Sequence, residues 1–488
     1  MERMYGIDAF SIYSATSTSP FATLKVTIYE PVDENDVPDM DEVRSFVESQ
    51  IERLGAGVMG MRIVRVPFDL HHPVWVADPD YSPDDHIYHA ALPAPGDKAK
   101  LCEFLSDLMG RPLDPDRPLW EVWLVEGLAG GRIAIAIKVH HALADGKTTA
   151  TLLARSHSPA VAGRGPRNSG EVEAIPGRLR LVGDALVDLF KTYTDELPQF
   201  YRELKQARAR ALEDEESPDG EGAGAETVDE ELPPAPFTVL NRRAGGRYRI
   251  YRYETFSLTG FKRLAHAFDC TLNVLVMAVC SEALKRYLRD VGDLPTTSLL
   301  TAMPIGDRGG RARKTRLHTG PPHNSLAVAV LPLHQDIEDF AERVQAIKRS
   351  SKAAIRRVQR SYGRRFDNFL EFLPGISVRW VHALLERQQA KGSSAYANVV
   401  ISNVPGPRKA LYALDGRLRM VELLSTGNIM DLGHLNVTVW SYVDNLTFSF
   451  YMRKAGLPEP DKIPAYVKEV VEELQKGGLT GEPRGLAS

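Results

Sequence analysis

The chain has 488 residues, 43% of them hydrophobic and 25% charged, which is typical of a globular protein with two domains or one large α/β unit. Its formal net charge of -4 gives no support for a nucleic-acid-binding role. The three cysteines, Cys102, Cys270 and Cys280, lack the spacing of a metal site or a disulfide framework, which favours a reducing, cytosolic compartment.

The first half of the chain alternates strand and helix patterns, and its N-terminus lacks the pattern of a secretory signal. Residues 21–29 (FATLKVTIY) predict a strand, whereas residues 41–54 and 100–109 carry apolar side chains at helical spacing. A proline-punctuated loop leads into a strand at 120–126, and a second strand begins at Ile133 after a Gly-Gly turn. We expect these last two strands to form a hairpin.

The most informative stretch, residues 133–149 (IAIAIKVHHALADGKTT), joins a strand to a helix. Alternating isoleucine and alanine predict a buried strand that ends in His140 and His141, and Asp145 and Gly146 then turn the chain toward a helical pattern. Imidazole titrates near neutral pH, so a histidine on a rigid strand end can take a proton from a hydroxyl group and return it. The stretch predicts an acid–base site; the alternative is a pair of structural histidines with Asp145 as a helix cap.

Two other histidine pairs are interpreted as structural. His71 and His72 precede a proline and have no suitably placed acid, which indicates a surface loop. His86 and His89 have a metal-like spacing, but no cysteine or third ligand lies near them in the sequence. The sequence therefore predicts no metal site.

An acidic segment divides the chain. Residues 178–212 form a helical pattern broken at Pro198, and residues 213–236 are acidic, rich in glycine and proline, and nearly free of large apolar side chains. We interpret 213–236 as a flexible linker between an N-terminal domain at 1–212 and a C-terminal domain at 237–488.

The second half also mixes strands and helices, and its last two strands form a hairpin through Asp444-Asn445. Strands are predicted at 248–256, 298–304, 324–332, 398–403, 435–442 and 446–451. Helices are predicted at 258–268, 271–288, 337–359 and 461–476.

Three stretches together resemble one family. VHHALADG is similar to the HHxxxDG signature of coenzyme A-dependent acyltransferases, Pro118-Leu119-Trp120 resembles their PLW motif, and Asn398–Arg408 (NVVISNVPGPR) resembles a C-terminal signature. Over nearly the whole chain the sequence resembles the bacterial wax ester synthase/diacylglycerol acyltransferase family. That resemblance implies an α/β (α+β) fold of two chloramphenicol-acetyltransferase-like domains, with mixed sheets and an interdomain channel.

The resemblance also implies an activity: transfer of a long-chain acyl group from acyl-CoA to a hydroxyl acceptor, either diacylglycerol or a long-chain alcohol. Acyl-CoA would be a co-substrate, with no further cofactor. His141 matches the family's general base, His140 shapes the site, and Gly146 allows the tight turn. Asp145 would orient the loop through a salt bridge, for which Arg308 is a candidate partner.

Candidate groups for the oxyanion or the CoA thiol are Asn273, Ser402 and Asn403, with hydrogen bonding at loop and helix ends as the equal alternative. The sequence has no GxSxG elbow and no cysteine beside a base, which favours direct transfer over an acyl-enzyme. Val274 stands where the family usually has an acid. Two alternatives therefore stay open: a lipid-binding protein that has lost catalysis, and an acyltransferase that uses a sugar or polyketide hydroxyl.

Two segments are strongly basic, 308–316 and 348–365. Because the chain as a whole has a negative net charge, these basic clusters are a real asymmetry. They could bind CoA phosphates or an anionic membrane surface, and the alternative is a solvated helix face. We expect a cytoplasmic protein that reaches its lipid acceptor peripherally, at the inner membrane or on a lipid droplet. The sequence leaves the oligomeric state open.

Overall fold

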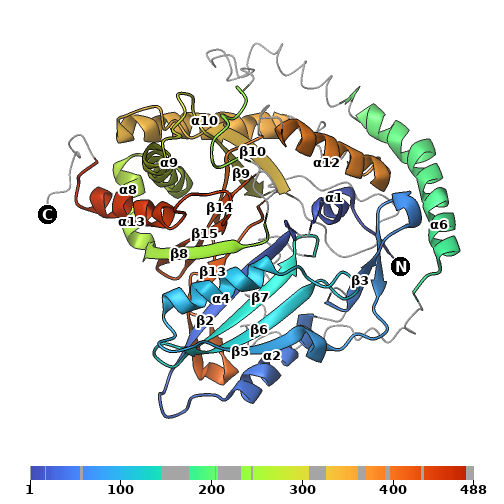
Figure 1. The fold of residues 1–488 in the computed structure, drawn as a ribbon, viewed down its shortest axis with the longest axis horizontal. Helices are drawn as coiled ribbons and strands as arrows, with labels where there is room; N and C mark the ends of the chain where they lie inside the picture. Colours follow the sequence, from blue (N-terminus) through green and yellow to red (C-terminus); the bar gives the residue numbers. More distant parts are fainter. Residues whose placement is uncertain are drawn as a thin grey trace.

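Two six-stranded mixed sheets form the framework of the protein (Figure 1). The computed structural model describes residues 2–16, 18–54, 59–143, 175–203, 205–206, 232–242, 246–306, 326–360, 370–390, 396–429 and 433–479. A third, small sheet has the order β1-β4-β3. Its strands are Glu2–Arg3, Val74–Ala77 and Met61–Val64.

The first sheet has the order β12-β13-β2-β7-β6-β5. In that order its strands are Tyr412–Ala413, Leu418–Ser425, Ala22–Pro31, Arg132–His140, Trp120–Leu128 and Ile87–Ala91. All neighbours are antiparallel except β5 and β6. Since β12 and β13 come from the second half of the chain, the two halves share this sheet.

The second sheet has the order β10-β9-β11-β14-β15-β8. In that order its strands are Leu326–Pro332, Leu300–Gly306, Val399–Val404, Leu435–Tyr442, Asn445–Arg453 and Arg249–Ser257. Strand β11 runs parallel to both of its neighbours, and the other pairs are antiparallel.

Four strands of each sheet repeat one arrangement. The set β2-β7-β6-β5 has two antiparallel pairs followed by a parallel pair, and so does the set β8-β15-β14-β11. In each set the second and third strands are an antiparallel hairpin, β6–β7 and β14–β15. The end of β7 in the first half therefore corresponds to the end of β15 in the second.

Helices cover the sheets through apolar faces. Helix α4 (Lys98–Gly110) packs with β2 and with β8 of the other sheet, which joins the two halves. The large core of the second half lies between its sheet and four helices, α8 (Leu258–Ala267), α9 (Leu272–Asp290), α10 (Phe340–Arg360) and α13 (Lys462–Gln475). The remaining α-helices are α1 (Gly6–Ser14), α2 (Met40–Leu54), α6 (Arg178–Lys191) and α12 (Gly375–Ala390).

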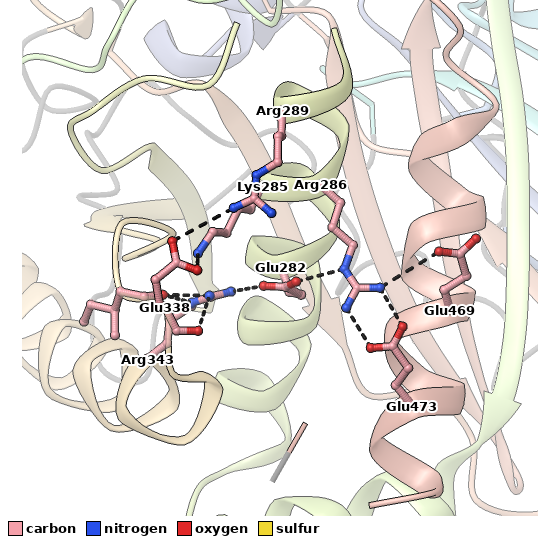
Figure 2. Close-up of polar contacts among 9 residues, drawn as sticks. Glu282, Lys285, Arg286, Arg289, Glu338, Arg343, Glu469 and Glu473 are labelled. Carbon is pink, nitrogen blue, oxygen red and sulfur yellow. Dashed lines mark hydrogen bonds and ion pairs between the residues drawn. The ribbon is translucent and has the colours of Figure 1, made fainter. Parts of the chain in front are cut away.

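An ion network ties three of these helices together (Figure 2). Glu282 of α9 accepts a hydrogen bond from Arg343 of α10 at 2.6 Å and one from Arg286 at 2.8 Å. Arg286 also binds both carboxylate oxygens of Glu473 on α13, each at 2.7 Å. Arg343 is fully buried and donates to the Ile337 carbonyl as well, so its charge is compensated by a carboxylate and a backbone carbonyl.

Within the described residues no single helix is long and apolar enough to cross a membrane. Helices α8 and α9 pass that test only as a pair, and the pair is bent by 91°. Both helices contribute to the large core of the second half.

Most of the predicted elements are confirmed, including the β6–β7 hairpin. The last hairpin turns one residue earlier than expected, at Val443 and Asp444. The helix is not broken at Pro198: α6 continues through a π-helical turn, Thr192–Glu196, just before the proline, which cannot donate a backbone hydrogen bond.

The prediction that His71 and His72 lie in a surface loop is wrong. Both side chains are buried, the carbonyl of His71 accepts from the Tyr13 hydroxyl at 3.3 Å, and the His72 ring contacts the Leu370 carbonyl at 2.8 Å. Residues far away in the sequence cover these histidines, which local sequence cannot reveal. The domain boundaries and the linker at 213–236 stay a prediction, because most of the linker lies outside the described residues.

Candidate active site

The end of strand β7 is held from both sides. The His140 amide donates to the Leu119 carbonyl at 3.0 Å, and the His141 amide donates to the Phe21 carbonyl at 2.9 Å. Leu119 precedes β6 and Phe21 precedes β2, so each histidine is anchored by a neighbour of β7. These bonds fix the backbone of both histidines before any substrate arrives.

His140 is a buried, neutral residue. Only 4% of it is exposed, and its Nδ1 accepts a hydrogen bond from the Ala142 amide at 3.2 Å. Burial, and then the neighbouring His141, lowers the pKa of His140 to about 3. Its imidazole therefore stays unprotonated near neutral pH and holds the turn after the strand.

His141 is placed differently. The backbone bond to Phe21 continues the ladder, so its side chain leaves β7 on the opposite face from His140, the face of Val139 and Ile137. It is only partly buried, which leaves it accessible. Of the two histidines, His141 has the placement that a general base requires.

The PLW segment anchors the start of β6, the strand that pairs with β7. Trp120 is 1% exposed, donates its Nε1–H to the Met59 carbonyl at 2.7 Å and stacks on His86 with ring centroids 4.4 Å apart. His86 in turn contacts the Trp120 carbonyl at 2.9 Å. The tryptophan is thus a core anchor, and His86 belongs to its packing.

Three predicted residues fall outside the described part of the chain: Asp145, Gly146 and Arg308. The helix expected after Gly146 and the basic segment 308–316 lie there too. The roles given to these residues remain predictions.

Asn273 lies in the first turn of α9, whose start is capped by Thr271. Its amide nitrogen lies 3.1 Å from the Met303 sulfur on β9. The next residue, Val274, is 4% exposed and packs in the core of the second half. The position where the family usually has an acid is therefore an apolar core position in this chain.

Ser402 and Asn403 leave strand β11 on opposite faces, because side chains alternate along a strand. Ser402 lies opposite Thr438 on the face that also carries Asn436. Asn403 shares the other face with Ile401, toward the helices. The structure separates the two members of this candidate pair.

A polar seam between the two halves was missed by the sequence analysis. The buried Lys25 of β2 donates to the Ser425 hydroxyl at 2.7 Å and to the Thr426 carbonyl at 3.3 Å. The Thr426 hydroxyl accepts from the Leu24 amide at 2.9 Å, which extends the pairing of β13 with β2. A lysine in the middle of an apolar strand pattern was the signal that could have indicated the seam.

A second contact between the two halves lies just before Phe21, the partner of His141. Ser19, two residues before Phe21, donates to the Ile429 carbonyl at 2.8 Å.

Among the described residues, no group of three or more His, Cys, Asp or Glu side chains is arranged to hold a metal ion.

Comparison with known families gives matches over most of the chain. Residues 4–276 match the wax ester synthase/diacylglycerol acyltransferase catalytic domain, and residues 323–475 match the C-terminal domain of the same family. The first match includes both histidines, and the second includes Ser402 and Asn403.

Two relatives are similar along most of their length. A Mycobacterium tuberculosis protein with a provisional assignment as a diacylglycerol O-acyltransferase is 31% identical over 451 residues, which cover 91% of this chain and 90% of that protein. The O-acyltransferase WSD of Acinetobacter baylyi is 27% identical, with 82% of each chain covered.

Solved structures show the same fold. The wax ester synthase/diacylglycerol acyltransferase of Marinobacter aquaeolei superposes with a TM-score of 0.66 at 23% identity, covering 98% of this chain and all of that one. The first condensation domain of the calcium-dependent antibiotic synthetase superposes with a TM-score of 0.55 at 14% identity, covering 99% and 96%. The expected fold class is thereby confirmed.

Proposed function

This chain belongs to the wax ester synthase/diacylglycerol acyltransferase family, and on that premise we propose that it moves an acyl group from acyl-CoA to the hydroxyl group of a lipid. The acceptor is diacylglycerol, a long-chain alcohol, or both. The observation that carries the proposal is the accessible His141 beside a buried, neutral His140 at the anchored end of β7.

In the proposed mechanism His141 acts as the general base. Its imidazole takes the proton of the acceptor hydroxyl while the oxygen attacks the thioester carbonyl carbon. The tetrahedral oxyanion then collapses, the carbon–sulfur bond breaks, and the imidazolium returns the proton to the leaving CoA sulfur. The products are the ester and CoA with a free thiol, and His141 is regenerated.

The cysteines support direct transfer rather than a covalent acyl-enzyme. Burial raises the pKa of the Cys102 and Cys270 thiols to about 11 and that of Cys280 to about 12. All three therefore stay protonated near neutral pH, and a protonated thiol is a poor nucleophile.

The alternative of a lipid-binding protein without catalysis rests on Val274. In the structure this residue fills the core at the start of α9, so its identity is explained by packing. A sugar or polyketide hydroxyl as the acceptor stays a second candidate, which a panel of acceptors distinguishes.

Release of free CoA tests the proposal. Purified protein is incubated with a long-chain acyl-CoA and either dioleoylglycerol, hexadecanol, a glycoside or no acceptor, and the thiol and the ester product are both quantified. We expect CoA release that depends on one of the two lipid acceptors, with matching ester. Lipid binding without CoA release would support the non-catalytic alternative, and release with the glycoside alone would support the other.

A further inference from the structure

Three elements of the first and second halves expose large apolar side chains on one edge of the molecule. They are α6, the short 3-10 helix η1 (Pro67–Asp69) and α12. We call the following six residues the apolar rim: Phe68, Leu186, Phe190, Ile376, Trp380 and Leu384. Phe68 is 82% exposed, and Phe190 and Trp380 are each 69% exposed.

The rim is a second apolar face on helices that already bury one. In α6, Leu181 and Ala185 are buried, whereas Leu186 and Phe190 lie four residues apart on a different side and face outward. In α12, Val378 is buried, whereas Ile376, Trp380 and Leu384 recur every four residues and stay exposed. A helix that packs on a protein core needs only the first of these faces.

Contacts join the three elements into one surface. The η1 segment contacts both α6 and α12, and its Asp69 carboxylate is paired with Arg379 of α12. Just beyond α6, the Tyr193 hydroxyl donates to the Phe372 carbonyl at 2.9 Å, and the rings of Phe200 and Phe372 pack in a tilted arrangement with centroids 5.0 Å apart. Figure 1 shows α12 and α6 following the outer edge of the molecule, with the end of α10 next to α12.

Phe68 projects from this surface in an unusual backbone conformation. Its φ of 59° lies in the left-handed region, which is unfavourable for a bulky side chain. Neither packing nor local conformation accounts for a large aromatic residue at this tip. Backbone strain of this kind is concentrated at functional positions.

Exposed basic side chains lie on the same helices as the rim. They are Arg178 and Lys191 of α6 and Arg387 of α12. The acids of α6 are paired, Asp184 with Arg180 at 3.8 Å and Asp188 with Arg3 at 2.7 Å. Against a chain net charge of -4, this edge combines apolar side chains with basic ones.

We propose that the apolar rim docks on an anionic lipid surface. An exposed tryptophan, exposed phenylalanines and flanking arginines and lysines are the side chains that lie at a membrane interface. The inference rests on the proposed function, because the acceptor of that reaction is an apolar molecule held in such a surface. It differs from purely electrostatic attachment through the basic part of α10, because insertion of aromatic side chains supplies most of the binding.

Vesicle sedimentation tests the proposal with vesicles of phosphatidylcholine and phosphatidylglycerol in equal amounts. The rim variant Phe68→Ser/Phe190→Ser/Trp380→Ser should partition to these vesicles at least about tenfold less than the wild type. The matched control is Phe237→Ser/Tyr248→Ser/Tyr412→Ser, which removes three exposed aromatic rings from other parts of the surface and should bind like the wild type.

Two further measurements separate loss of lipid docking from damage to the active site and from loss of a dimer interface. CoA release with a short-chain acyl-CoA and a water-soluble alcohol should be unchanged in the rim variant, and so should its size-exclusion mass. Three outcomes would each overturn the proposal. Vesicle binding could be unchanged in the rim variant, it could fall equally in the control variant, or the rim variant could lose a dimer that the wild type forms. Absence of CoA release in the wild type would refute the proposed function alone, since vesicle binding is measured without catalysis.

Discussion

The two halves of the chain build the same four-strand arrangement but end its second strand differently. In the first half, β7 ends with His140 opposite Ala22 and His141 beside Phe21. In the second half, β15 ends with Arg453 directly opposite Arg249 of β8. Both arginines are buried, Arg249 donates to the Tyr451 hydroxyl at 3.1 Å, and both contact the Gly246 carbonyl.

One arrangement of strands supports a candidate acid–base site in the first half and a structural cluster of guanidinium groups in the second. The fold supplies a rigid strand end, and the residues at that end decide what it does. The following predictions test this division from the largest expected effect to the smallest.

Replacing His141 should affect catalysis without affecting stability. We expect His141→Ala to lower kcat by ~10²–10⁴-fold, the usual contribution of a general base, with Tm close to that of the wild type. The corresponding variant of the second half, Arg453→Met, should instead lower Tm, because it removes a buried group from the second half. CoA release and thermal unfolding of both variants check this. Comparable kcat losses in both would contradict the division into a catalytic strand end in the first half and a structural one in the second.

Breaking the ion network of the second half should be costly for stability. Glu282→Ala leaves the charge of the buried Arg343 without its carboxylate, which we expect to lower the free energy of unfolding by about 3–5 kcal/mol. Glu469→Ala is the matched control, since this half-exposed acid lies 3.9 Å from Arg286 and should cost less than about 1 kcal/mol. Urea denaturation measures both, and equal costs would show that the network adds little.

Acidification should destabilise both halves through buried histidines. The pKa of His140 is lowered to about 3 and that of His434 to about 4, in both cases chiefly by burial. Between these values and 6.5 the unfolded chain binds protons that the folded chain does not, so the stabilising contribution is complete above 6.5 and is lost as pH falls. Each histidine contributes a slope of up to about 1.4 kcal/mol per pH unit.

Urea denaturation between pH 7 and pH 5 measures this slope. His140→Asn and His434→Asn should each reduce it, because neither replacement side chain titrates in this range. An unchanged slope in both variants would contradict neutral burial of these rings.

His140→Ala should lower kcat by about tenfold, which is less than the loss in His141→Ala. The loss in His140→Ala comes from a misplaced turn and not from a missing base. Stability should fall as well, since the variant leaves a cavity under the turn. The ratio of the two kcat values is the informative quantity, and a larger loss in His140→Ala would reverse the assignment of roles.

Restoring an acid at position 274 should have the smallest effect on rate. Val274 packs in the core at the first turn of α9, so we expect Val274→Asp to change kcat by less than about threefold while it lowers Tm by burying a carboxylate. A large gain in kcat would show that the missing acid limits catalysis.

Local pattern was enough to predict the strand that ends in His140 and His141, since alternation of small and branched residues is a property of neighbours in sequence. It also predicted the β6–β7 hairpin and Trp120 as a core anchor. It could not predict β13 beside β2, the burial of His71 and His72, or the partners of Lys25 in the polar seam, because each depends on segments that are far apart in the sequence. The candidate pair Ser402 and Asn403 was separated by alternation along β11, which the sequence alone could have indicated.

The central claim is that His141 lets the acceptor hydroxyl attack the thioester directly. The most direct test mixes enzyme with an equimolar amount of long-chain acyl-CoA in the absence of any acceptor, and records free CoA and the intact mass of the protein. The account predicts no burst of CoA and no change in protein mass until a lipid alcohol is added. A stoichiometric burst, together with a mass increase equal to one acyl group, would contradict it.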